Sequence, residues 1–225
     1  MKLPFPLFVP FGCTGYARVV YPYDVPMGVS LGEVRAVLVY TPNMLWYRFY
    51  PIDYESYVKY VFGIAMKFGV PTYAVITGLS LDSVINYGVK INQAIYKLGL
   101  SSDLVTFIIP AREVLSKELY GNQYVALYAG FHARVMPGVY ADCMDIDHCR
   151  MCGKSPRECV DSLKRFISWA WRKLPGKPKV HLLNIPRRFL DYASSLRQFI
   201  ASADTDYFLR LRRAYPHVGK CLLFR

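Results

Sequence analysis

The feature that most constrains the fold is an alternation of short, strongly apolar segments with longer amphipathic ones along the chain. Short runs rich in β-branched and aromatic residues are typical of strands, and longer runs with apolar residues three and four apart are typical of helices. The run 105–109 is almost continuously apolar, which favours a parallel strand buried on both faces. The sequence therefore predicts an α/β protein.

Eight segments are expected to form strands: 7–11, 35–41, 72–77, 104–109, 124–129, 180–185, 200–203 and 221–224. Helices are expected at about 53–68, 81–98, 112–119, 156–173 and 187–199. Eight strands with helices between them predict a closed (βα)8 barrel of the TIM type, as a single domain over residues 1–225. An open, doubly wound parallel sheet is the alternative.

Helix boundaries carry their own signals. Asp53 stands where the first helix should begin, and an aspartate there can accept hydrogen bonds from the free backbone amides of the first turn. Gly69 and Gly99 follow the first two helices and suit the left-handed residue that ends many helices. These positions fix the predicted boundaries more firmly than composition does.

The chain is basic, with 28 Lys and Arg against 16 Asp and Glu and a formal charge of +12. Such an excess favours polyanionic partners, so a nucleic acid is an expected partner. No stretch of eighteen residues lacks charge, so no membrane-spanning helix is expected, and prolines near the N-terminus do not fit a signal peptide. We expect a cytoplasmic protein without a membrane partner, and few Gln and Asn fit a thermophilic source.

Candidate chemistry lies at the strand ends, because barrel enzymes place reactive groups at the carboxyl-terminal ends of their strands. Asp204 and Asp206 follow the apolar run 200–203, where a carboxylate serves as nucleophile, base or metal ligand, or simply caps a helix. His132 and Arg134 follow the predicted strand 124–129 and are candidates for substrate contacts. His181, on an apolar strand, is more often a core histidine.

Two segments resemble a known family. Residues 180–185, Val-His-Leu-Leu-Asn-Ile, look like the "His-Leu-x-Gly-hydrophobic" strand of the tRNA-guanine transglycosylase superfamily, which includes relatives that place 7-deazaguanine bases in DNA. Residues 201–207, Ala-Ser-Ala-Asp-Thr-Asp-Tyr, resemble its "Ser-Ala-Asp-Ser" segment. Fainter likeness extends over roughly residues 35–213.

The resemblance implies a glycosyltransferase that exchanges guanine for a 7-deazaguanine-type base in tRNA or DNA. Asp204 would be the nucleophile, with Asp206 as the close alternative, and the reaction would need no cofactor. Arg187, Arg188 and Arg210 would hold backbone phosphates, and the family's frequent pairing implies a homodimer. The sequence departs from the family at residues 40–43, Tyr-Thr-Pro-Asn, where a second aspartate is missing. The alternative is a non-catalytic barrel that binds nucleic acid or a protein partner.

Four cysteines fall within seventeen residues, in a loop expected at about 137–159. Their spacing predicts a structural zinc site. The expected ligands are Cys143, Cys149, Cys152 and Cys159, with His148 as an alternative ligand. Two disulfides, an iron–sulfur cluster and direct use of the cluster by a metal-dependent enzyme are the other interpretations. Cys13 and Cys221 fall near the first and last predicted strands, where barrel closure would bring them together.

Overall fold

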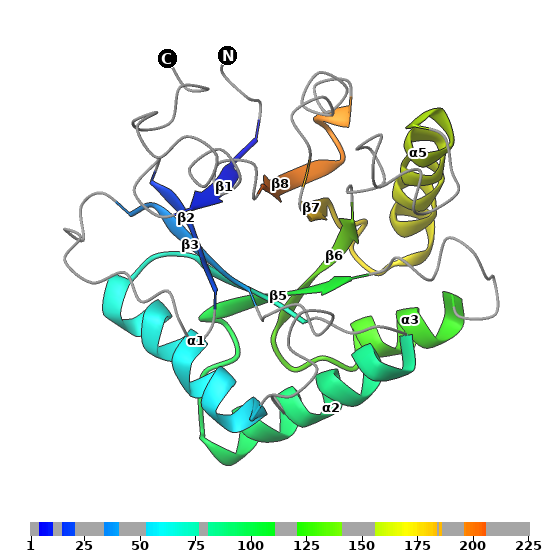
Figure 1. Ribbon diagram of the computed structural model, residues 1–225. Coiled ribbons are helices and arrows are strands. Elements are labelled where there is room, and N and C mark those ends of the chain that lie inside the picture. The colour runs from blue at the N-terminus through cyan, green and yellow to red at the C-terminus, as the bar shows by residue number, and fades with distance from the viewer. Residues whose placement is uncertain are drawn as a thin grey trace.

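Eight parallel strands form a closed barrel in which each strand pairs with the next along the chain (Figure 1). The computed structural model describes residues 5–10, 15–20, 34–40, 53–76, 81–110, 121–140, 156–183, 185 and 196–205. The strands are β1 (Leu7–Pro10), β2 (Tyr16–Val20), β3 (Ala36–Tyr40), β4 (Thr72–Val75), β5 (Val105–Pro110), β6 (Arg134–Tyr140), β7 (Val180–Leu183) and β8 (Ile200–Asp204). Pairing of β1 with β8, in the register Leu7 to Ala203, closes the ring. The predicted TIM-type barrel is confirmed, and the open sheet is excluded.

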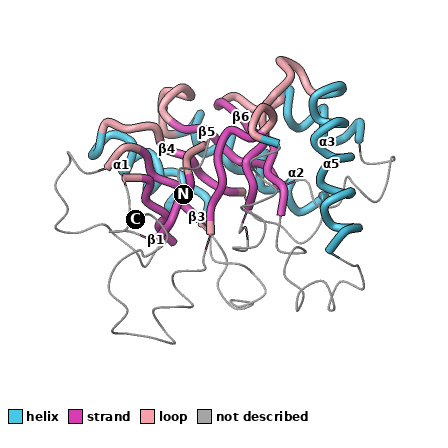
Figure 2. The backbone as a smooth tube through the Cα atoms, turned by 90° about the horizontal axis from the view of Figure 1, so that it is seen from above, coloured by secondary structure: helices cyan, strands magenta, loops and turns pink. Residues whose placement is uncertain are grey.

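Four described helices cover the outside of the barrel. They are α1 (Tyr54–Phe68) after β3, α2 (Leu81–Lys97) after β4, α3 (Gly121–Ala129) after β5 and α5 (Pro156–Lys173) after β6. In Figures 1 and 2 these helices lie outside the ring of strands, on the side of β3 to β6. None of the described helices combines the length and apolar character that a membrane crossing needs.

Six of the predicted strands coincide with observed ones, and the differences have physical reasons. The predicted strand 124–129 is wrong, because these residues belong to α3. A short apolar run is not long enough for the periodicity of a helix to be distinguished from that of a strand. The missed strand β6 contains Pro137 and Gly138, which usually interrupt strands. The predicted strand 221–224 and helix 112–119 lie outside the described residues. So do residues 187–195 of the predicted helix 187–199, whose last four residues form a turn before β8.

The other missed strand is β2. Only residues 11–15 separate it from β1, with which it pairs in parallel. Parallel neighbours normally need a crossover of about a dozen residues or more, so a strand that follows so soon contradicts the usual pattern. This strand contributes Arg18, whose side chain is 11% exposed and forms an ion pair with Asp204 on β8.

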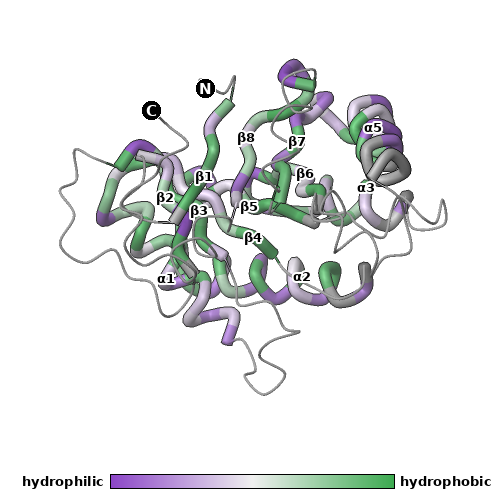
Figure 3. The backbone as a smooth tube through the Cα atoms, turned by 45° about the horizontal axis from the view of Figure 1, so that its top comes forward, coloured by the Kyte–Doolittle hydropathy of each residue, from purple (hydrophilic) through white to green (hydrophobic). Residues whose placement is uncertain are grey.

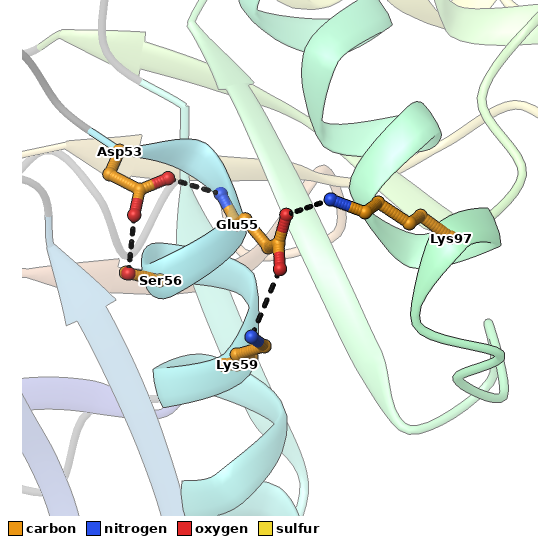
Figure 4. A network of polar contacts seen from close by, with 5 residues as sticks. All are labelled: Asp53, Glu55, Ser56, Lys59 and Lys97. Atoms are coloured by element: carbon orange, nitrogen blue, oxygen red, sulfur yellow. Dashed lines mark hydrogen bonds and ion pairs between the residues drawn. The ribbon is translucent and has the colours of Figure 1, made fainter.

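The expected helix boundaries are confirmed at α1. The Asp53 carboxylate accepts a hydrogen bond from the Glu55 backbone amide at 3.0 Å and another from the Ser56 hydroxyl (Figure 4). Gly69 ends the helix in the left-handed conformation, with φ of 59°. Gly99 adopts the same conformation after α2, with φ of 62°.

A surface ion-pair network joins α1 to α2. Figure 4 shows the Glu55 carboxylate between Lys59, at 3.0 Å, and Lys97, at 2.6 Å. The hydrogen bond from Lys97 and then that from Lys59 hold the pKa of Glu55 below its ordinary value, and the bond to Glu55 raises the pKa of Lys97. These side chains are exposed or half-exposed, so solvent screens the network.

The apolar core has two layers separated by the strands, as β3 illustrates. Ala36, Leu38 and Tyr40 belong to the cluster inside the barrel, whereas Val37 and Val39 belong to the cluster beneath the helices. Successive residues of a strand point to opposite faces, so an apolar strand supplies both layers. The strands are correspondingly hydrophobic along most of their length in Figure 3.

The side chain of Tyr124 ties a covering helix to the barrel. Its hydroxyl donates a hydrogen bond at 2.8 Å to the carbonyl of Ile109 on β5. Burial raises the pKa of this tyrosine well above its ordinary value, so the hydroxyl remains a donor across the physiological range. The hydrogen bond explains why an aromatic, strand-like run is stable as the inner face of a helix.

Gly138 is required by packing. A Cβ at this position would lie 2.6 Å from Cγ2 of Ile108 and 3.0 Å from Cδ1 of Leu183. Both neighbours belong to the cluster inside the barrel, so the glycine lets β6 approach β5 and β7 there. Glycine counts against a strand in a sequence-based prediction, but in the structure Gly138 allows β6 to pack between β5 and β7.

Candidate functional site

Asp204 ends β8, at the carboxyl-terminal end of the barrel where the sequence predicts reactive groups. Its side chain turns into the barrel and is fully buried. Two side chains from other strands contact its carboxylate: His181 from β7 and Arg18 from β2. These three residues form the axial cluster, together with Ser202 and Tyr40, whose contacts follow.

His181 links the two polar residues of β8. Its Nε2 lies 3.1 Å from Oδ1 of Asp204, and its Nδ1 lies 2.8 Å from Oγ of Ser202. Both ring nitrogens are therefore satisfied while the ring itself is fully buried. In the neutral ring, Nε2–H donates to the carboxylate and the serine hydroxyl donates to Nδ1. His181 is a core histidine, as its apolar strand suggests, but one that orients a carboxylate.

Arg18 supplies the positive charge of the cluster. Its Nε lies 3.3 Å from Oδ2 of Asp204, and its side chain is 11% exposed. The guanidinium lies over the ring of Tyr40, with Cζ 4.4 Å from the ring centroid. Tyr40 ends β3, so the arginine is held between a carboxylate and an aromatic face at the carboxyl-terminal side of the barrel.

Below the cluster the barrel is filled with aromatic rings. Phe8 contacts Tyr16 and Tyr73 edge-on, with centroids 5.8 and 5.5 Å apart, and its ring lies 6.2 Å from that of His181. Burial raises the pKa of Tyr73, so this side chain stays neutral. Ser202 lies two residues before Asp204 on the same strand and is 3% exposed.

Arg18 and Tyr40 were not predicted as site residues. Arg18 lies on the strand that the sequence pattern missed, and Tyr40 was noted only because residues 40–43 lack a carboxylate. One signal was available, since Arg18 is a lone charge within the otherwise apolar or aromatic run 16–20. A single charged residue in such a run indicates a buried partner of opposite sign.

His132 and Arg134 lie at the opposite end of the barrel from Asp204. Arg134 is the first residue of β6 and His132 precedes it, because the segment before them is a helix rather than a strand. The His132 backbone amide donates to Asn92, and the exposed Arg134 side chain lies 3.5 Å from Asp103. The structure therefore does not bring these two residues to Asp204.

Several predicted site residues lie outside the described residues: Asp206, Arg187, Arg188, Arg210, Cys143, His148, Cys149 and Cys152, with Cys13 and Cys221. Of the predicted loop 137–159, residues 137–140 belong to β6 and residues 156–159, with Cys159, belong to α5; the residues between them lie outside the described part of the chain. The residues that the structure describes contain no cluster of three or more potential metal ligands. The zinc site and its ligands stay a prediction.

No family model matches the sequence, and no curated protein matches it. Among solved structures, the chain is similar to the 4-hydroxy-tetrahydrodipicolinate synthase from the thermoacidophilic methanotroph Methylacidiphilum fumariolicum SolV. That match has a TM-score of 0.46 and 12% identity, and it covers 94% of this chain and 70% of the synthase chain. A likeness at this level bears on no activity.

The predicted membership of the tRNA-guanine transglycosylase superfamily is wrong: no family model and no curated protein matches the sequence. The predicted exchange of guanine-type bases is wrong with it. The role of Asp204 as the nucleophile of that exchange was inferred from the resemblance; in the structure its carboxylate contacts Arg18 and His181. Apolar strands of parallel barrels follow one burial pattern, so short segments match without a shared activity.

Proposed function

We propose that this protein is a barrel enzyme that binds a small organic anion at its carboxyl-terminal end and transfers a proton to or from it. The observation that carries the proposal is the convergence of Arg18, Asp204 and His181 at that end of the barrel. Arginine and aspartate supply an anion-binding group and a proton acceptor next to each other. Acid–base chemistry on an anion needs these two groups side by side.

The free-energy cost of the cluster supports a functional role. Removing charged groups from water costs several kcal/mol per ion, and a buried ion pair is often no more stabilising than apolar residues of similar volume. The rest of the barrel interior is filled by apolar and aromatic side chains. A charged arginine and a carboxylate among such residues are not needed for the core, and charged groups that a core does not need are often found at active sites.

Arg18 is the group that we assign to the anion. Its planar guanidinium has donors on several edges, of which Asp204 takes the Nε edge. Its Nη1 is buried and has no hydrogen-bond partner within the described part of the chain. A carboxylate or phosphate oxygen placed there would satisfy that donor, and Tyr40 beneath the guanidinium keeps its plane in place.

Asp204 is the group that we assign to proton transfer, with His181 as its positioning residue. The ring nitrogen holds one carboxylate oxygen, while the other oxygen lies on the side of Arg18. A ligand bound to Arg18 would therefore be next to the second oxygen. Apo structures often show catalytic contacts longer than they are during the reaction, and the 3.3 Å distance between Arg18 Nε and Asp204 Oδ2 fits such a site.

Two other chemistries fit the cluster less well. None of the eight strands carries a lysine or a cysteine, so they offer no amine for an imine and no thiolate nucleophile. Ser202, His181 and Asp204 are connected in the order of a serine hydrolase triad. Ser202, however, precedes Asp204 on β8 and so lies further from the carboxyl-terminal strand end, where barrel enzymes place their reactive groups.

Thermal stability in the presence of small anions tests the binding step. A panel of carboxylates, keto acids and phosphate esters should contain a ligand that raises the Tm of the wild type and has a much smaller effect on Arg18→Lys. Lysine keeps the charge but loses the planar fork that holds an anion at two points. Arg134→Lys is the matched control, because that arginine also faces an aspartate but at the other end of the barrel.

Solvent deuterium exchange tests the chemical step. The ligand found in the panel is incubated in D2O with the enzyme, and NMR follows replacement of carbon-bound hydrogen. Asp204→Asn should abolish exchange and still bind the ligand, because the amide keeps the shape of the carboxylate. The proposal is refuted if no anion in the panel distinguishes the wild type from Arg18→Lys, or if exchange persists in Asp204→Asn.

A further inference from the structure

A second binding surface lies at the amino-terminal end of the barrel, where α5 meets the residues that lead into β8. A shallow cleft of about 540 Å³ is lined by Ser168, Trp171, Arg172, Gln198 and Phe199. Trp171 is 40% exposed, which is unusual for the largest apolar side chain on a helix that otherwise covers the barrel. Figure 1 shows α5 on the outside of the molecule, away from α1 and α2.

The indole ring of Trp171 is held at a fixed angle. Phe199 contacts it edge-on, with centroids 5.8 Å apart and planes at 87°. The ammonium group of Lys177 lies over the ring, 5.1 Å from its centroid. An exposed ring that contacts one aromatic neighbour edge-on and lies under the exposed Lys177 side chain offers a flat stacking surface.

The backbone at Lys177 supports a specific role for this contact. Lys177 has φ of 48° and follows Gly176, which has φ of 73°. A non-glycine residue in this left-handed region is strained, and such strain is retained mainly where the surrounding structure needs it. The turn brings the chain back over α5, so the lysine reaches Trp171 from beyond the helix end.

The surroundings of the cleft are strongly basic. Residues 162–190 contain no Asp or Glu. The same stretch contains Lys164, Arg165, Arg172, Lys173, Lys177, Lys179, Arg187 and Arg188. Arg172, Lys173, Lys177 and Lys179 are exposed around the end of α5. Arg172 and Ser168 both line the cleft, and the Arg172 Nε–H donates a hydrogen bond at 3.1 Å to the Ser168 carbonyl. Positive charge this dense favours a polyanion.

We propose that the Trp171 cleft binds single-stranded nucleic acid. A base stacks on the indole in the place that Lys177 now covers, and Lys177 moves to an adjoining phosphate together with Arg172 and Lys173. The inference is independent of the proposed enzyme activity, because the cleft and the axial cluster lie at opposite ends of the barrel. An acidic protein would also contact the basic side chains, but only a nucleic acid has bases that can stack on the exposed ring of Trp171.

Fluorescence anisotropy with two labelled strands tests the proposal. One strand is an oligothymidylate of about twelve nucleotides, within the usual span of such sites, and the other is an abasic strand of the same length and charge. The wild type should bind the thymidylate roughly tenfold more tightly than the abasic strand, which measures stacking alone. Trp171→Ala should bind the two strands equally, and Trp171→Leu serves as a second variant that keeps apolar bulk.

The charge contribution is measured by the salt dependence of binding. With three cations on phosphates, log Kd should change with log salt concentration with a slope of about 2. Lys177→Gln should lower that slope by about 0.7. Two substitutions on α2 are the matched controls. Tyr96→Ala removes an aromatic ring that is 88% exposed, and Lys90→Gln removes a cation that lies over an aromatic ring, 5.5 Å from the centroid of Tyr54. Neither control should change binding.

Three outcomes would overturn the inference. Equal binding of the abasic strand and the thymidylate by the wild type would show that charge alone accounts for the affinity and that no base stacks on Trp171. A loss in Tyr96→Ala as large as that in Trp171→Ala would show that binding is not localised to the cleft. Competition by polyglutamate as effective as that by unlabelled thymidylate would identify an acidic protein as the occupant.

Discussion

Removal of the Arg18 guanidinium should destabilise the protein strongly, because it breaks a buried ion pair with the Asp204 carboxylate. Nε of Arg18 lies 3.3 Å from Oδ2 of Asp204, and the two side chains are 11% and 0% exposed. Breaking a buried ion pair by deleting one partner costs about 3–5 kcal/mol. Arg18→Met, which keeps most of the side-chain volume, should therefore lower the free energy of unfolding by about 3 kcal/mol or more.

A second substitution separates the loss of the pair from the loss of packing. In the double variant Arg18→Met with Asp204→Leu, both charges of this pair are removed, and such replacements are often close to neutral. Asp204→Leu alone removes the carboxylate that pairs with Arg18 and accepts from His181. It should therefore lower the free energy of unfolding as much as Arg18→Met does. The double variant should thus be more stable than either single variant, with a coupling of about 2 kcal/mol or more.

Urea unfolding followed by circular dichroism gives the three free energies on one scale. The surface pair of Arg134 and Asp103 is the control, since its atoms are 3.5 Å apart but its side chains are 67% and 75% exposed. Arg134→Met should cost less than about 1 kcal/mol. Equal costs for Arg18→Met and Arg134→Met, or additive effects in the double variant, would contradict the view that the axial cluster is a buried ion pair.

Gly138→Ala should destabilise the protein by about 1–3 kcal/mol, because its methyl group would lie 2.6 Å from a side-chain carbon of β5; a Tm equal to that of the wild type would argue against this packing. Tyr124→Phe should cost about 1–2 kcal/mol in urea unfolding, since the buried carbonyl of Ile109 loses its donor, and an unchanged midpoint would show that the hydrogen bond contributes nothing. Lys97 and Lys59 lower the pKa of Glu55, so the stability that Glu55 contributes is present above its ordinary pKa and lost as the pH falls through its folded pKa. The Tm difference between wild type and Glu55→Gln should therefore narrow from about pH 5 towards pH 3, and a difference independent of pH would exclude the ion pair as its source.

The motifs at the carboxyl-terminal end of the chain show how far a short resemblance can mislead. Segments 180–185 and 201–207 match a pattern of apolar strands that end in polar residues, and every parallel barrel repeats that pattern. What the carboxylate of Asp204 does depends on the residues opposite it. Those residues come from β2 and β7, and a motif within one segment cannot show them.

The sequence by itself determined the fold class, the borders of α1, α2 and α5, and most strands. These follow from local rules: periodicity sets the type of element, and residues such as Asp53 and Gly69 set its ends. Asp204 at a strand end could also be predicted, because a parallel barrel places such residues on one side.

Only the tertiary structure decided which strands complete the barrel and which side chains meet on its axis. The strand β6 forms although it contains Pro137 and Gly138. Ile108 and Leu183 pack where a side chain at position 138 would lie, and no rule based on neighbouring residues in the sequence predicts this contact. Arg18 reaches Asp204 because closure of the ring places β1, β2 and β8 side by side, across most of the chain length. Local propensity acts over a few residues, whereas the burial of a charge beside its partner is a property of the closed barrel as a whole.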